Sequence, residues 1–174
     1  MKYFFMTAAA LALTGCATAG GQGTTSNAPS NTKHAQPIIG HPDATPFVAT
    51  ANAKADVAEA LRVAKAEDKF GLIVMGANWC HDSRSLAGLF QTPRFQTLLG
   101  DNYSLAYVDV GQKDKNLDVA KDFGLSTIEG TPTVFVTSSS GKVLNLDDAP
   151  TWRDAASRDS DDIYAYFAKY TGQS

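Results

Sequence analysis

The sequence of 174 residues has few cysteines, little net charge and no hydrophobic run long enough for a membrane-spanning helix. Two cysteines are too few for a disulfide framework, and the different surroundings of Cys16 and Cys80 argue against a bond between them. A formal charge of −3 gives no reason to expect a nucleic acid as a partner. What is present is the composition of a globular protein, with 44% hydrophobic and 19% charged residues.

The N-terminus has the features of an export signal. Lys2 precedes an apolar run over residues 3–13, which is too short to cross a bilayer as a helix. The run ends in the letters LTGC, which resemble the bacterial lipobox, where the cysteine is diacylated and becomes the new N-terminus after cleavage. We therefore expect residues 1–16 to be a lipoprotein signal peptide and Cys16 to carry a lipid anchor. The alternative is an ordinary secretory signal that is cut after residues 17–19.

A lipid on Cys16 would hold the protein in a bacterial cell envelope, facing the periplasm. If the host is Gram-negative, Ala17 after the cysteine resembles an outer-membrane sorting signal. Residues 17–46 are rich in small and polar residues, and they cannot bury enough apolar surface to offset chain entropy. We expect a flexible linker with a reach of roughly 30 Å, followed by a folded domain over residues 47–174.

The rest of the chain alternates helix and strand patterns. Residues 70–77 are a continuous apolar run, as expected for a strand that is buried on both faces. Residues 133–137 and 143–146 read as strands joined by a link of hairpin length. The other predicted elements are a strand over 105–110, a short strand over 47–49, and helices over 52–68, 83–90, 94–99, 116–123 and from Ser160 onward. This order predicts an α/β fold with a mixed sheet covered on both faces.

Two motifs resemble the thioredoxin superfamily. Trp79-Cys80-x-x-Ser83 directly follows the predicted buried strand. About fifty residues later, the dipeptide Thr131-Pro132 stands just before the predicted hairpin. The cysteine motif and the proline motif occur at the expected points in the order of strands.

The resemblance covers residues 47–170 and implies a thioredoxin-like three-layer sandwich, with a central mixed sheet flanked by helices. In that family the proline is cis and lies beside the active cysteine, so the same is implied for Pro132. The chain departs from the family at two positions, because Ser83 replaces the second cysteine and Val74 replaces a buried acid. Since a serine oxygen neither attacks nor forms a mixed disulfide, this chain cannot cycle as thioredoxin does.

Cys80 stands at the predicted start of a helix. Free backbone N–H groups and the helix dipole favour a thiolate there. A protonated His81 would strengthen this effect, whereas Asp82 would oppose it. We therefore expect a reactive, solvent-exposed thiol, with Ser83 hydrogen-bonded to the thiolate.

Trp79, His81 and Thr131 are the predicted binding residues around the sulfur. The resemblance implies that the backbone beside Pro132 pairs with an extended substrate segment. A purely structural interpretation stands beside each of these roles: Trp79 as a packing residue at the rim, His81 as a solvated side chain, and Cys80 as an inert core residue.

The sequence thus predicts a tethered monothiol protein of thioredoxin type. Cys80 would attack a substrate disulfide or sulfenic acid and form a mixed disulfide, so that isomerase or deglutathionylation chemistry fits. The expected partners are envelope protein thiols and disulfides or a low-molecular-weight thiol, with no cofactor, metal ion or nucleic acid. The alternative is a non-catalytic binding or scaffold lipoprotein with the same fold. Metal delivery through Cys80 and His81 would need further ligands.

Overall fold

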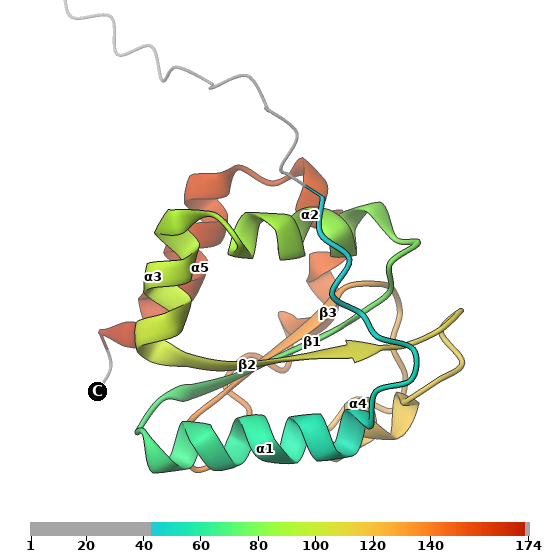
Figure 1. Cartoon of the computed structure of the whole chain (residues 1–174), viewed down its shortest axis with the longest axis horizontal. Helices are drawn as coiled ribbons and strands as arrows, with labels where there is room; N and C mark the ends of the chain where they lie inside the picture. The colour runs from blue at the N-terminus through green and yellow to red at the C-terminus, as the bar shows by residue number, and fades with distance from the viewer. Residues whose placement is uncertain (1–42, 173–174) are drawn as a thin grey trace, which may run out of the picture. The chain divides into compact units, whose positions relative to one another are not determined.

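The computed structural model describes residues 43–172, in which a β-sheet lies between two layers of helices (Figure 1). Within these residues the sheet has the strand order β2-β1-β3, with β1 at Phe70–Gly76, β2 at Tyr103–Asp109 and β3 at Thr133–Thr137. β2 runs parallel to β1, and β3 runs antiparallel to it. The predicted mixed sheet is therefore confirmed.

The helices cover both faces of the sheet. α1 and α4 lie on one face, and α2, α3 and α5 lie on the other (Figure 1). Their bounds are α1 Ala53–Ala66, α2 His81–Phe90, α3 Pro93–Asn102, α4 Leu117–Asp122, the 3₁₀ helix η1 Ala149–Ser157, and α5 Ser160–Thr171. This is the three-layer arrangement that the sequence motifs implied. None of the described helices is both long and apolar enough to cross a membrane.

β1 is the centre of the molecule because it contributes to two hydrophobic cores. Leu72 and Val74 belong to the core under α2, α3 and α5, whereas Ile73 and Met75 belong to the core against α1 and α4. All four side chains are fully buried. A strand covered on both faces needs apolar side chains at every position, which explains the continuous run in the sequence.

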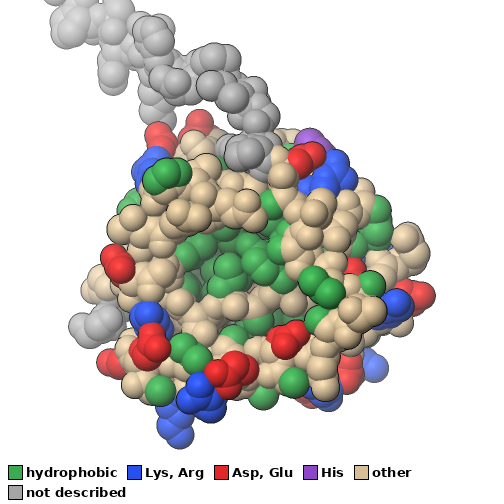
Figure 2. Space-filling view, viewed as in Figure 1, with side chains coloured by type: hydrophobic (Ala, Val, Ile, Leu, Met, Phe, Trp, Pro, Cys, Tyr) green, Lys and Arg blue, Asp and Glu red, His purple; other side chains and the backbone are tan. Residues whose placement is uncertain are grey.

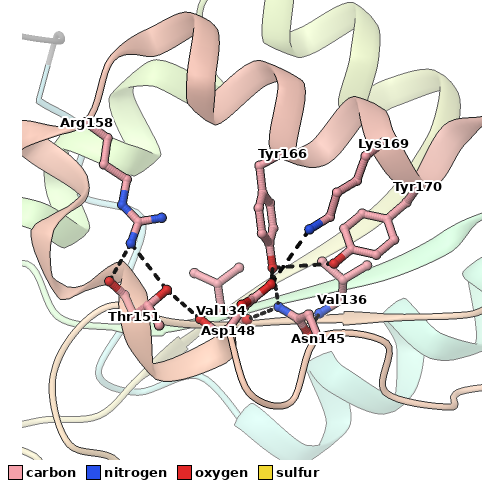
Figure 3. Close-up of polar contacts among 9 residues, drawn as sticks. All are labelled: Val134, Val136, Asn145, Asp148, Thr151, Arg158, Tyr166, Lys169 and Tyr170. Carbon is pink, nitrogen blue, oxygen red and sulfur yellow. Dashed lines mark hydrogen bonds and ion pairs between the residues drawn. The ribbon is translucent and has the colours of Figure 1, made fainter.

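Residues 143–146 do not form the predicted second strand of a hairpin, so that prediction was wrong. The described structure has only an isolated bridge there. The buried side chain of Asn145 pairs with β3 instead: its Oδ1 accepts from the Val136 N–H at 2.7 Å, and its Nδ2 donates to the Val134 carbonyl at 2.8 Å (Figure 3). Because one side chain satisfies these backbone groups, a second strand is not needed along this stretch of β3.

The same amide links β3 to the last helix. Asn145 Nδ2 also contacts the Tyr166 hydroxyl of α5 at 3.0 Å (Figure 3). The Lys169 ammonium lies 3.8 Å from the centre of the Tyr166 ring. Beside them, the fully buried Trp152 of η1 stacks on Phe167 with ring centres 5.1 Å apart. The segment after β3 is therefore packed against α5.

Residues 47–49 do not form the predicted short strand either. The backbone of Phe47 is hydrogen-bonded to the side chain of Asn78 instead of to a strand. β2 consequently forms one edge of the described sheet.

On the face of the molecule that Figure 2 shows, hydrophobic side chains form the floor of a hollow. The β2 residues Leu105 and Tyr107 are only partly buried.

Candidate functional site

Cys80 lies at the junction between β1 and α2. A turn after β1 is closed by a hydrogen bond from the Cys80 N–H to the Ala77 carbonyl at 3.0 Å. Cys80 has extended backbone angles and is the N-cap residue of α2, although its side chain accepts no hydrogen bond from the helix. The predicted position at a helix start is confirmed.

Cys80 and Pro132 lie close together, as the family resemblance implied. The Thr131–Pro132 peptide bond is cis. The Cys80 Sγ donates a hydrogen bond to the carbonyl oxygen of Thr131 at 3.2 Å, across 51 residues of sequence. Cys80, Thr131 and Pro132 therefore form one site between the start of α2 and the loop that leads into β3.

The prediction of a solvent-exposed thiol is wrong for this structure. Only 8% of Cys80 is accessible, and Thr131 is similarly buried. The sulfur lies within hydrogen-bond distance of a carbonyl oxygen, a contact in which a thiol can act as donor. A thiolate would face that oxygen without a proton to share, so ionisation requires the sulfur to exchange this contact for the free N–H groups in the first turn of α2.

Ser83 is not hydrogen-bonded to the sulfur, which corrects a second expectation. Its side chain is fully buried, and its Oγ has no hydrogen-bond partner among the described residues. The hydroxyl lies beside the end of β1, since a Cβ built on Gly76 would come within 2.7 Å of it. Ser83 thus faces the sheet.

Trp79 and His81 flank Cys80 in the sequence and differ in how they are held. Trp79 is 49% exposed, and its Nε1 donates to the Gly111 carbonyl at 2.7 Å. The indole is therefore an exposed group of fixed orientation at the rim of the site. His81 is exposed at the first position of α2. The neighbouring Asp82 accepts a hydrogen bond from the Ala156 N–H at 2.9 Å, which ties α2 to η1.

Arg84 is a site residue to which the sequence motifs give no role. Its Nη1 donates to the carbonyl of Asn78 at 3.1 Å and to that of Trp79 at 3.4 Å. Arg84 follows Cys80 by one helical turn, and side chains on a helix point back towards its N-terminus. That spacing is the signal that could have identified it.

Arg153 borders the loop that carries Thr131 and Pro132, and sequence reasoning assigned it no role. A Cβ on Gly130 would lie 3.1 Å from the Arg153 Cβ, so the arginine stem packs directly on this glycine. Its Nη1 bonds to Glu129 at 2.8 Å. A cavity of about 290 Å³ lies here, lined by Glu129, Pro150, Thr151, Arg153, Asp154 and Arg158.

The remaining sequence predictions concern a metal site and the N-terminal part of the chain. Among residues 43–172 no group of three or more His, Cys, Asp and Glu side chains could hold a metal ion. The predicted lipidation site Cys16, the signal peptide and residues 17–42 of the linker lie outside the described residues. Residues 43–46 were assigned to the linker, yet Ala44 is buried and contacts α2. Contacts with the domain therefore begin before Phe47.

The chain is similar to known proteins. A family model described as thioredoxin-like matches residues 52–138. A disulphide isomerase from Xylella fastidiosa Temecula1 is 32% identical, with 74% of this chain and 98% of that chain covered and a TM-score of 0.68. A protein of unknown function from Pseudomonas aeruginosa is 18% identical over 71% of this chain and 87% of that one, with a TM-score of 0.39. The comparison with curated proteins gives no match.

Proposed function

Because the chain belongs to the thioredoxin-like family, we propose that it carries out thiol-disulfide exchange through Cys80 alone. One observation carries the proposal: Cys80 begins α2 within hydrogen-bond distance of the Thr131 carbonyl, next to the cis Pro132. The similarity to a disulphide isomerase supports the same reaction class.

The reaction begins when Cys80 loses its proton and its hydrogen bond to Thr131. The N–H groups in the first turn of α2 and the helix dipole stabilise the resulting thiolate. The thiolate attacks one sulfur of a substrate disulfide, so that a bond between Cys80 and the substrate forms and the other sulfur leaves as a thiolate. The Thr131 carbonyl is then free to accept a backbone N–H of an extended substrate segment.

A single sulfur limits the overall reaction. Ser83 cannot expel the substrate, because a hydroxyl does not attack a mixed disulfide under these conditions. In isomerisation, a second thiol of the same substrate attacks the mixed disulfide, forms a new substrate disulfide and releases Cys80. In deglutathionylation, Cys80 takes glutathione from a modified substrate, and a low-molecular-weight thiol then removes that glutathione as a disulfide. Both routes leave Cys80 as a thiol again, and neither produces a net dithiol oxidation.

The site of action that fits the sequence is a bacterial envelope, with the domain tethered through lipid on Cys16 and facing the periplasm, at the outer membrane in a Gram-negative host. The support is the LTGC pattern after a short apolar run. Several acyl chains on one N-terminus anchor strongly, since each buried methylene contributes roughly 0.8 kcal/mol. Mass spectrometry of the mature protein should find lipid mass on Cys16, and a mature chain without that mass would contradict the anchor.

The test of the chemistry is capture of a mixed disulfide on Cys80. The full chain is incubated with oxidised glutathione, and the tryptic peptide over residues 70–84, which contains Cys80, is analysed by mass spectrometry. We expect a glutathione adduct that a free thiol removes, and no adduct on this peptide in Cys80→Ser. If the folded wild-type protein forms no adduct with glutathione or with peptide disulfides, the proposal fails.

A second candidate function is a binding or scaffold protein without turnover. The observation that favours it is the low accessibility of Cys80 together with its hydrogen bond to the Thr131 carbonyl. Cys80→Ala separates the two functions, because a scaffold would keep its partners and its cellular phenotype after this substitution.

A further inference from the structure

The segment before α1 is bound to the loop that carries Cys80. In Figure 1 this segment, coloured cyan, runs past α2 and continues to the start of α1. Phe47 and Asn78 form a reciprocal pair: the Phe47 N–H donates to Asn78 Oδ1 at 3.2 Å, and Asn78 Nδ2 donates to the Phe47 carbonyl at 2.8 Å. One side chain of the loop thus holds the backbone of a segment 31 residues away.

Arg84 provides a second anchor for the same segment. The Ala44 N–H donates to the Arg84 carbonyl at 3.2 Å, and the Asp43 carboxylate pairs with Arg84 Nε at 3.2 Å. The same guanidinium donates to the carbonyls of Asn78 and Trp79. Arg84 therefore connects the N-terminal segment, the loop before Cys80 and the first turns of α2.

The side chain of Phe47 adds a hydrophobic contact to these two anchors. Phe47 is 3% exposed and meets Tyr107 edge to face, with ring centres 5.4 Å apart. A Cβ on Gly76 would lie 2.6 Å from the Phe47 Cζ, so the ring fills the space directly above this glycine. The segment is consequently held at the end of β1, immediately before the loop that leads to Cys80.

From these contacts we propose that residues 43–47 form a strap that positions Cys80. By holding Asn78 and Arg84, the strap fixes the loop and keeps the sulfur against Thr131, where little of it is accessible. Release of the strap frees the loop, breaks the bond between Cys80 Sγ and Thr131, and exposes the thiol. This inference rests on the proposed function, in which Cys80 is the reacting group, and it makes Asn78 and Arg84 positioning residues.

The strap is tested by measuring how fast iodoacetamide alkylates Cys80 in the folded full chain at neutral pH. Asn78→Ala removes both hydrogen bonds to Phe47 and should raise the rate roughly tenfold, because local opening of the loop becomes easier. Asn102→Ala is the matched control, since Asn102 is also half-buried and donates to a carbonyl, that of Leu98, at 2.9 Å. It lies at the opposite end of the sheet from Cys80, and its rate should equal the wild-type rate within error.

The dependence on urea separates positioning from general loosening. At urea concentrations well below the unfolding midpoint, local release gives a raised rate that hardly changes with urea, whereas global unfolding gives a rate that climbs with it. An Asn78→Ala rate that equals or falls below the wild-type rate overturns the proposal. The proposal is also overturned if Asn102→Ala raises the alkylation rate as much as Asn78→Ala does, or if the raised rate of Asn78→Ala increases with urea.

A second variant covers the case in which Asn78→Ala does not fold. Asp43 is exposed, so Asp43→Ala removes only the ion pair with Arg84 and should raise the rate roughly twofold. If the alkylation rate of Asp43→Ala does not rise, the strap proposal is wrong. The glutathione experiment remains separate, because a wild-type chain without an adduct refutes the exchange reaction while the alkylation comparison still tests how the sulfur is held.

Discussion

Ser83 stands three residues after Cys80 and has its hydroxyl beside the sheet rather than on the sulfur. A buried hydroxyl without a partner costs stability, and the Ser83 Oγ has no hydrogen-bond partner within residues 43–172. The position is nonetheless one helical turn from the sulfur, at a separation of backbone atoms that a disulfide can span. What prevents a redox cycle here is therefore the atom at this position and not the backbone.

We predict that Ser83→Cys forms an intramolecular disulfide with Cys80. Both residues lie in the tryptic peptide over residues 70–84, so the bond appears as a loss of two hydrogens from that peptide under mild oxidation. The variant should also gain the ability to reduce protein disulfides with a dithiol as electron donor, which the wild type should lack.

Ser85→Cys is the control for this experiment. Ser85 is also buried on α2, but it lies on another face of the helix, and its new thiol should not reach Cys80. A Ser83→Cys protein that keeps two free thiols under oxidation would contradict the prediction.

At the scale of elements, the site is the meeting point of the end of β1, the start of α2 and the strap. Gly76 is where they touch, because a Cβ on this glycine would come within 2.6 Å of Phe47 and 2.7 Å of Ser83. No side chain fits between the strand and these two neighbours. The close packing of the three elements therefore depends on this glycine.

We predict opposite effects for one substitution at two glycines. Gly76→Ala should destabilise the protein by about 1–3 kcal/mol, because its Cβ would come within 2.6 Å of Phe47. Gly100→Ala should be neutral or stabilising by up to about 1 kcal/mol, since Gly100 lies inside α3 with nothing within 4 Å of the new Cβ. Urea unfolding of the two variants measures both. Equal shifts of the two unfolding midpoints would contradict the prediction that close contact with Phe47 excludes a side chain at position 76.

At the scale of the whole molecule, several tyrosines pack in the core on one face of the sheet, the face covered by α2, α3 and α5. Burial raises the pKa of Tyr107 to about 12 and also raises the pKa of Tyr103 and of Tyr166 above the usual value. The Tyr103 hydroxyl donates to the Phe167 carbonyl at 2.6 Å. These hydroxyls are part of the packed interior in their neutral form.

Stability should therefore fall at alkaline pH. An unfolded tyrosine loses its proton near pH 10, whereas the folded Tyr107 keeps its proton until about pH 12. Between these values the folded state binds more protons, so the free energy of unfolding decreases as pH rises. Urea unfolding across this range measures the fall. Tyr107→Phe should make it shallower, and an identical fall in that variant would contradict a contribution from Tyr107.

The sequence by itself determined the family-level arrangement and the residues that meet at its centre. The apolar run of β1, the cysteine at a helix start and the Thr131–Pro132 dipeptide are local patterns, and local chemistry fixes what each becomes. The central strand, the position of Cys80 at the start of α2 and its closeness to Pro132 could be predicted for this reason. The neighbouring Arg84 carried only a weak signal in its spacing.

The tertiary structure alone decided how accessible the sulfur is, where Ser83 points and what covers the edge of β3. Each of these depends on contacts between segments that are distant in sequence: Thr131 with Cys80, Phe47 with Asn78, and Asn145 with β3. A predicted strand at 143–146 failed because a single amide side chain can satisfy the backbone groups that a strand would pair with. The periodicity of a sequence indicates which face of an element is apolar, but it does not indicate which distant segment packs against that element.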